Sequence, residues 1–193
     1  MIRQSRIEFS VSAAGCVAAA LMVLILPLQW LIAMVLAAAV HELCHLICLK
    51  LCGISVYGIH VGLHGAAIQT AIVSPAQELL CAAAGPLGSF LCLIFARFFP
   101  LLALCAFWQG IYNLLPLYPF DGGRMLHSLA ELTAPSHTDM ICRFVTRCTI
   151  AGIFLTCVFL YFRTFKLLFL ILSGYFLLTT VLSRKTPCKE GRY

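Results

Sequence analysis

The sequence contains few charged residues. Only 10% of its 193 residues are Asp, Glu, Lys or Arg, and just seven of these are acidic. Soluble domains carry roughly 25% charged residues, and disordered chains combine high net charge with low hydrophobicity. Neither class fits a chain that is 62% hydrophobic with a mean hydropathy of +1.01. The composition therefore predicts a polytopic membrane protein with too little polar sequence for a second domain.

The eleven cysteines do not form the pattern of a disulfide framework. Their number is odd, and most of them lie inside apolar runs. Disulfides are typical of small secreted domains, whereas a reduced cysteine behaves as a small buried hydrophobe. We therefore interpret most of these side chains as reduced thiols that pack between helices.

Six apolar runs are candidates for transmembrane helices. They cover residues 11–27, 29–51, 76–98, 101–117, 145–162 and 164–182. Pro27 and Pro100 predict tight turns after the first and third runs. The third helix is expected to begin at Ser74, with Pro75 at its first position and Gln77 completing a capping box.

The distribution of basic residues predicts the orientation. Six spans place both termini on one side of the membrane, and basic residues favour the cytoplasmic side. With cytoplasmic termini, three basic residues lie outside, namely Arg97, Arg163 and Lys166. The other ten lie inside: Arg3, Arg6, Lys50, Arg124, Arg143, Arg147, Arg184, Lys185, Lys189 and Arg192. This pattern indicates membrane orientation, and we expect a lipid bilayer and no nucleic acid as partner.

Residues 53–72 are neither a span nor a soluble loop. They carry no formal charge and mix β-branched residues with Gly58, Gly62 and Gly65, which favours strand over helix. Non-helical backbone at membrane depth must pair with itself or line a wet cavity. The expected fold is therefore an all-α polytopic membrane protein with about six transmembrane helices and a short membrane-embedded β-hairpin after the second.

The second span contains the sequence His41-Glu42-Leu43-Cys44-His45. Residues four apart lie one above the other on a helix, so both imidazoles can bind one metal ion. Glu42 is offset by about 100° from His41, which lets it reach a water molecule beside the ion. Two ligands and a general base are the elements of an HExxH hydrolase motif.

A catalytic zinc site needs a third protein ligand. Glu78 is better explained as a complement to the dipole of the third helix, which leaves Asp121, followed by Gly122 and Gly123. Asp121 could instead cap a helix over residues 124–132. The topology favours the ligand, because the spans that carry HExxH and precede Asp121 both descend to the cytoplasmic side.

With these motifs the sequence resembles the site-2 protease family of intramembrane zinc metalloproteases. The first motif is His41-Glu42-x-x-His45, and Ala84-Gly85-Pro86-Leu87-Gly88 is similar to a small-residue motif of the family. The second motif is Asn113-x-x-Pro116-x-x-Pro119-x-Asp121-Gly122, whose spacing is similar to that of the branch containing stage IV sporulation protein FB.

The resemblance implies a role for each matching residue. His41, His45 and Asp121 would bind Zn²⁺, and Glu42 would be the catalytic base. Asn113 would help to hold the substrate or the developing oxyanion. The strands expected in residues 53–72 would receive the substrate.

The resemblance also implies partners and a location. The substrate would be a membrane-associated protein, such as a pro-sigma factor in sporulation, and inhibitory or regulatory membrane proteins are possible partners. The location would be a bacterial cell membrane. We expect one peptidase domain over residues 1–193, with a catalytic core at about 29–125, additional spans at 11–27, 145–162 and 164–182, and no CBS or PDZ domain.

Two other functions use the same residues. One is a non-catalytic membrane metal-binding or transport protein, which would not need the acid Glu42 beside its first ligand. The other is a catalytically silent relative, against which the intact set of motif residues argues. The pairs His60/His64 and Cys48/Cys52 are further candidates for metal binding, although a wet cavity lining and simple packing explain them as well.

Overall fold

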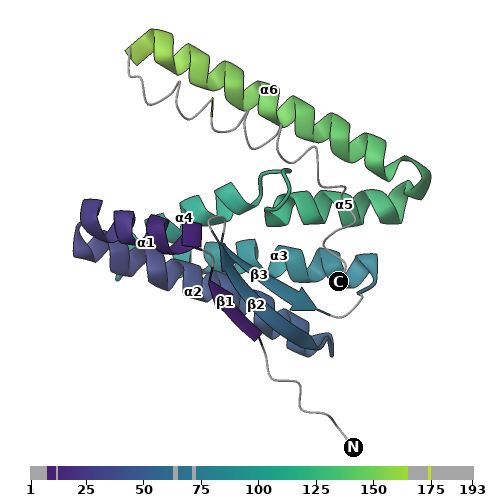
Figure 1. Ribbon diagram of the computed structural model, residues 1–193, viewed down its shortest axis with the longest axis horizontal. Coiled ribbons are helices and arrows are strands. Elements are labelled where there is room, and N and C mark those ends of the chain that lie inside the picture. Colours follow the sequence, from purple (N-terminus) through teal and green to yellow (C-terminus); the bar gives the residue numbers. More distant parts are fainter. Residues whose placement is uncertain (1–7, 12, 63–64, 71–72, 165–173, 175–193) are drawn as a thin grey trace, which may run out of the picture.

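Figure 1 shows the computed structural model of the protein, which describes residues 8–11, 13–62, 65–70, 73–164 and 174. Helices dominate the described part, and a small sheet lies against them. The fold begins with the strand β1 (Glu8–Val11), the helix α1 (Ala13–Ile25) and the long helix α2 (Leu28–Leu51). Pro27 separates the two helices, as predicted.

The buried face of α2 is a single stripe of residues four apart. Its members are Ala33, Ala37, His41, His45 and Leu49. The two alanines let α2 approach its neighbours closely, as small residues do between membrane helices. The helix packs against α3 (Pro75–Leu91) and α4 (Pro100–Asn113), so the histidines point into the protein.

The sheet has three strands in the order β1-β2-β3. The strand β2 (Val56–Gly62) pairs in parallel with β1 and antiparallel with β3 (Gly65–Thr70). Residues 63 and 64, which connect β2 to β3, lie outside the described residues, and the membrane depth of the sheet stays a prediction. The sequence analysis missed β1, because four residues are too few to establish an alternating pattern.

The third helix begins as predicted. The Ser74 hydroxyl accepts a hydrogen bond from the backbone N–H of Gln77, and Oε1 of Gln77 accepts one from the backbone N–H of Ser74. Pro75 is the first helical residue. A short 3₁₀ helix, η1 (Cys92–Phe95), continues α3. The chain then forms α4, an irregular turn, α5 (Asp121–Thr133), the 3₁₀ helix η2 (Pro135–His137) and α6 (Thr138–Thr164).

Within the described residues, three helices are long and apolar enough to cross a membrane. They are Leu28–Leu51, Pro75–Phe95 and Pro135–Arg163. The helices α1 and α4 have 13 and 14 residues, fewer than the roughly 20 that a full span needs. The sixth predicted span, 164–182, lies almost wholly outside the described residues. The count of six therefore stays a prediction.

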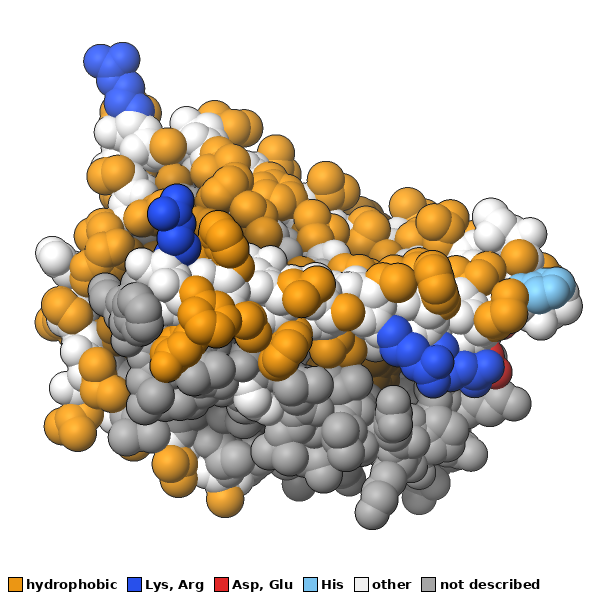
Figure 2. Space-filling model, turned by 90° about the horizontal axis from the view of Figure 1, so that it is seen from above, with side chains coloured by type: hydrophobic (Ala, Val, Ile, Leu, Met, Phe, Trp, Pro, Cys, Tyr) orange, Lys and Arg blue, Asp and Glu red, His pale blue; other side chains and the backbone are white. Residues whose placement is uncertain are grey.

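The surface of these helices is apolar. Figure 2 shows hydrophobic side chains over most of the described part of one face, with Lys and Arg side chains toward its two ends. On α6, Leu155, Phe159 and Phe162 are exposed. An exposed apolar surface of this kind is expected where lipid covers it.

Candidate metal centre

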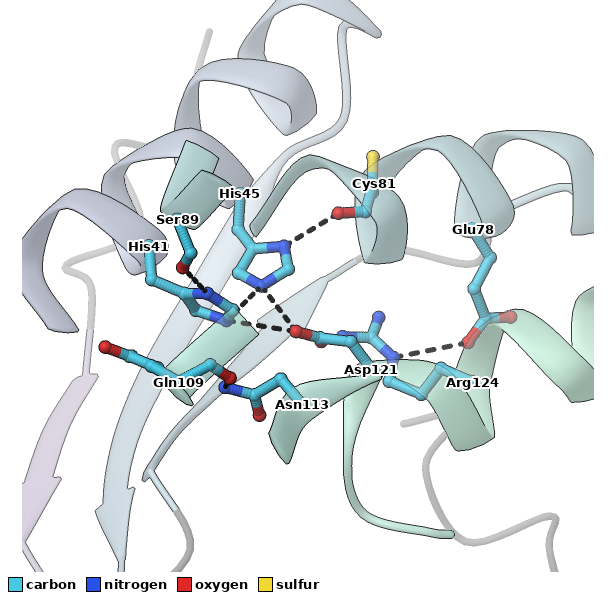
Figure 3. Close-up of polar contacts among 9 residues, drawn as sticks. All are labelled: His41, His45, Glu78, Cys81, Ser89, Gln109, Asn113, Asp121 and Arg124. Carbon is cyan, nitrogen blue, oxygen red and sulfur yellow. Dashed lines mark hydrogen bonds and ion pairs between the residues drawn. The ribbon is translucent and has the colours of Figure 1, made fainter. Parts of the chain in front are cut away.

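The two imidazoles of α2 meet a carboxylate from α5. The Nε2 atoms of His41 and His45 lie 3.0 and 3.1 Å from Oδ2 of Asp121 and 3.2 Å from each other. All three residues are buried, and Figure 3 shows their side chains converging from the two helices. Asp121 follows His45 by 76 residues and His41 by 80, so the fold brings distant parts of the sequence together here.

These three atoms are spaced like the ligands of a metal ion. In a tetrahedral zinc site with bonds of about 2.0–2.1 Å, two ligand atoms lie about 3.3 Å apart. The observed triangle is only slightly tighter. Two imidazole nitrogens and one carboxylate oxygen are also a common ligand set of catalytic zinc.

The other ring nitrogens support the same interpretation. Nδ1 of His45 lies 2.7 Å from the backbone carbonyl oxygen of Cys81. A carbonyl only accepts, so this nitrogen carries the proton. In the neutral ring, Nε2 of His45 then presents a lone pair to the carboxylate of Asp121, a repulsive contact that a bound cation would make attractive.

His41 is oriented by a second contact of the same kind. Its Nδ1 lies 2.9 Å from Oγ of Ser89, which is fully buried on α3. The ring nitrogen facing away from the metal position is therefore engaged in both histidines. Such outer contacts fix the ring orientation of metal-binding histidines.

Asp121 is held in its ionised form. Burial alone would raise the pKa of Asp121, but hydrogen bonds from the protonated rings of His41 and His45, together with the charges of those rings, lower it to about 2. The residue also lies in the first turn of α5, where the helix dipole favours a negative charge. The carboxylate is thus available as a ligand at neutral pH. Asp121 is the first residue of α5 and Phe120 is the N-cap, so Asp121 does not occupy the capping position considered from the sequence.

Two glycines allow close contacts between the chain segments around the site. A Cβ atom on Gly85 would collide with the imidazoles of both His41 and His45, and one on Gly122 would collide with the backbone carbonyl of Leu114. The backbone of α3 therefore lies directly against the two rings. Gly85 belongs to the small-residue motif noted in the sequence.

An ion pair connects α3 and α5 beside the site. Nε of Arg124 lies 3.6 Å from Oε1 of Glu78, and both side chains are partly exposed (Figure 3). Arg124 follows Asp121 by three residues, so the pair lies close to the end of α5 that carries the ligand. The sequence analysis assigned Glu78 only to the helix dipole and missed this partner.

Two comparisons with known proteins found similarities, one in sequence and one in fold. Residues 92–156 match the model of peptidase family M50. The fold is similar to that of the site-2 protease from Methanocaldococcus jannaschii, with a TM-score of 0.59 and 20% identity over 91% of this chain and 90% of that one. No curated protein sequence matches the chain.

The match to family M50 covers one of the two motifs. It contains Asn113 and Asp121, whereas His41, Glu42 and His45 precede it. The similarity to the site-2 protease covers both motifs but concerns the fold. The assignment of individual ligands therefore depends on the geometry described above.

The remaining predicted site residues lie around this centre. Glu42 is partly exposed on α2, next to His41. Asn113 ends α4, and its Nδ2 donates to the carbonyl oxygen of Gln109 at 3.2 Å. In Figure 3 the side chain of Asn113 lies below the contact between His41 and Asp121. His60 lies in β2, and His64 lies outside the described residues.

The contacts of Cys81 and Ser89 with the two histidines were not predicted from the sequence. A signal was present, because Cys81, Gly85 and Ser89 are four residues apart and so share one face of α3. In an apolar helix, such a line of small and polar residues indicates a face that packs closely against other residues.

Proposed function

We propose that the protein is an intramembrane zinc metalloendopeptidase that cleaves a membrane-associated protein near the cytoplasmic side. The observation that carries the proposal is the convergence of His41 Nε2, His45 Nε2 and Asp121 Oδ2 within 3.2 Å of one another. The match to peptidase family M50 and the site-2 protease fold support a peptidase over a transporter.

The residues of this chain have distinct roles in the proposed reaction. A zinc ion held by His41, His45 and Asp121 would supply Lewis acidity, which polarises a carbonyl and lowers the pKa of water to about 7. Glu42 accepts a proton from the attacking water and returns it to the leaving amine. Cys81 and Ser89 keep the imidazoles oriented during both steps.

The sheet is the proposed place for the substrate. A helical substrate hides its carbonyls in its own hydrogen bonds, so it must be extended before hydrolysis. Among the described strands, β2 pairs on both sides, whereas β1 and β3 each pair on one side only. The outer edge of β3 can therefore accept an extended segment through backbone hydrogen bonds, and we assign Asn113 to the same substrate.

Finer aspects of the function follow from the resemblance of the motifs. We propose membership of the branch of stage IV sporulation protein FB, with a pro-sigma factor in sporulation as a substrate and with regulatory membrane proteins. We also propose six spans with cytoplasmic termini in a bacterial membrane, and one peptidase domain with its core at 29–125.

Glu42→Gln tests the catalytic proposal. The chain is co-expressed with candidate substrates, and cleavage is measured beside the zinc content of the purified protein. We expect Glu42→Gln to abolish cleavage and to keep zinc, because all three ligands remain. Asp139→Asn, an acid-to-amide change at an exposed position of α6, is the control and should cleave normally. Cleavage that survives Glu42→Gln would remove the peptidase assignment and leave a non-catalytic metal-binding protein.

A proline scan through residues 66–69 of β3 tests the substrate edge. Successive N–H groups of a strand point to opposite edges. Prolines whose N–H faces β2 should therefore weaken the sheet, whereas the alternate prolines should reduce cleavage at unchanged zinc content and melting temperature. Full cleavage by every variant of the scan would contradict substrate binding at this edge.

A further inference from the structure

A second group of potential metal ligands lies beyond the histidines. Cys48 and Cys52 on α2 and Cys81 on α3 bring their sulfur atoms within 4.8 Å of one another. Cys48 and Cys52 are four residues apart, so they lie one above the other on one helix face.

This grouping is unusual among the cysteines of the chain. The structure describes ten free cysteines. Within the described residues, Cys48, Cys52 and Cys81 are the cysteines that form a group of three ligands. Packing as small hydrophobes explains single cysteines between helices, but it does not require three sulfur atoms to meet at one point.

The spacing and chemistry of the sulfur atoms suit a soft cation. With zinc–sulfur bonds of about 2.3 Å, two sulfur ligands lie about 3.8 Å apart, a spacing compatible with sulfur atoms that lie within 4.8 Å of one another. Thiolates select thiophilic ions such as Zn²⁺ and Cu⁺. Cys81 is buried, whereas Cys48 and Cys52 are half-buried, so an ion has access from the outer side of the group.

We propose that Cys48, Cys52 and Cys81 form a second metal site, specific for a thiophilic d¹⁰ cation and separate from the histidine site. Each coordinating thiol releases its proton to water as the metal–sulfur bond forms, and no electron is transferred. The ion links α2 to α3. It also fixes the residue whose carbonyl oxygen lies 2.7 Å from Nδ1 of His45, and so stabilises the orientation of that ligand.

Cadmium binding to the purified, reduced full chain tests the proposal. Cd²⁺ bound to thiolates gives an ultraviolet charge-transfer absorption that imidazole and carboxylate ligands do not give. We expect two Cd²⁺ per chain in the wild type and one, without this absorption, in Cys48→Ser/Cys52→Ser. The control Cys105→Ser changes a half-buried cysteine of α4 outside the group and should keep both ions.

The histidine variant His41→Ala/His45→Ala separates this proposal from the proposed peptidase function. It should lose cleavage and one Cd²⁺ but keep the thiolate absorption. A wild type that binds one Cd²⁺ without that absorption would overturn the thiol site and leave the peptidase intact. Equal absorption in the wild type and Cys48→Ser/Cys52→Ser would overturn it as well.

A second measurement needs no variant. The wild-type chain is alkylated with and without Cd²⁺, and each labelled cysteine is identified by mass spectrometry. Because the free thiolate is the reactive form, Cd²⁺ should prevent the labelling of Cys48 and Cys52 and leave that of Cys105 unchanged. Equal labelling of Cys48 and Cys52 in both samples would contradict the proposal.

Discussion

The two ligand groups on α2 differ in how their side chains are held. Each histidine of the first group makes one further contact, His41 with Ser89 and His45 with the carbonyl oxygen of Cys81. The ligand atoms of this group lie within 3.2 Å of one another. The sulfur atoms of the second group lie within 4.8 Å of one another, and two of its three cysteines, Cys48 and Cys52, are half-buried.

The difference indicates how far each site is organised before metal binds. The histidine site is already close to tetrahedral spacing, so an ion can bind with little rearrangement, as a catalytic site requires. The cysteine group is less enclosed, because Cys48 and Cys52 are half-buried, and part of its binding free energy would be used to order α2 against α3. Substitutions on α3 should therefore weaken metal binding at the histidine site most where the substituted residue contacts the two imidazole rings directly.

Gly85→Ala should have the largest effect. Its Cβ atom would collide with both His41 and His45, and overpacking of this kind costs about 1–3 kcal/mol of stability. We expect loss of zinc from the histidine site, loss of cleavage and a lower melting temperature. Zinc content, a cleavage assay and thermal unfolding in detergent measure these effects.

Gly152→Ala is the matched control for this change. Gly152 lies in α6, and no described residue comes within 4 Å of a Cβ atom built there. Alanine favours helix over glycine by about 1 kcal/mol, so zinc content and cleavage should be unchanged. A normal zinc content in Gly85→Ala would show that the close approach of α3 to the rings is not required.

Ser89→Ala should have an intermediate effect. It removes the hydroxyl that lies 2.9 Å from Nδ1 of His41 without touching the ligand atoms. Loss of such an outer contact typically reduces metal affinity or activity about 10–100-fold. Zinc affinity is measured by competition with a chelator, and the cadmium–thiolate absorption of the cysteine group should be unchanged.

Ser128→Ala provides the control for Ser89→Ala. Ser128 is also fully buried in a helix, but its hydroxyl has no hydrogen-bond partner among the residues that the structure describes. Removing it leaves no other polar group unpaired, so zinc affinity should not fall. An equal loss of affinity in both variants would mean that buried hydroxyls act through packing and not through His41.

The histidine site could largely be predicted from the sequence, because its information is local. The spacing of His41 and His45 places two potential ligands on one helix face, and the predicted order of the spans places Asp121 at the same depth. The outer contacts could not be predicted in the same way. Which carbonyl or hydroxyl meets each ring depends on the rotation of α3 against α2, which no short motif encodes.

In the fold, too, features set by a local motif were predicted, whereas features set by distant contacts were not. The start of α3 at Ser74 and Pro75 was predicted from capping chemistry and is confirmed. The strand β1 was missed, since its pairing with β2 joins residues about 50 positions apart. Such non-local pairing is not specified by the four residues of β1 alone.

Glu78→Gln should have the smallest effect on the histidine site. It weakens the 3.6 Å ion pair with Arg124, which connects α3 to the helix carrying Asp121. Partly exposed ion pairs contribute about 0.2–1 kcal/mol, so cleavage should fall only about two- to fivefold with zinc retained. The exchange Glu78→Arg/Arg124→Glu restores the opposite charges and should recover part of the loss, although it places a cation at the start of α3, where the helix dipole disfavours it. If the exchange is no better than Glu78→Gln, then Glu78 acts through that dipole, and the ion pair does not help to position Asp121.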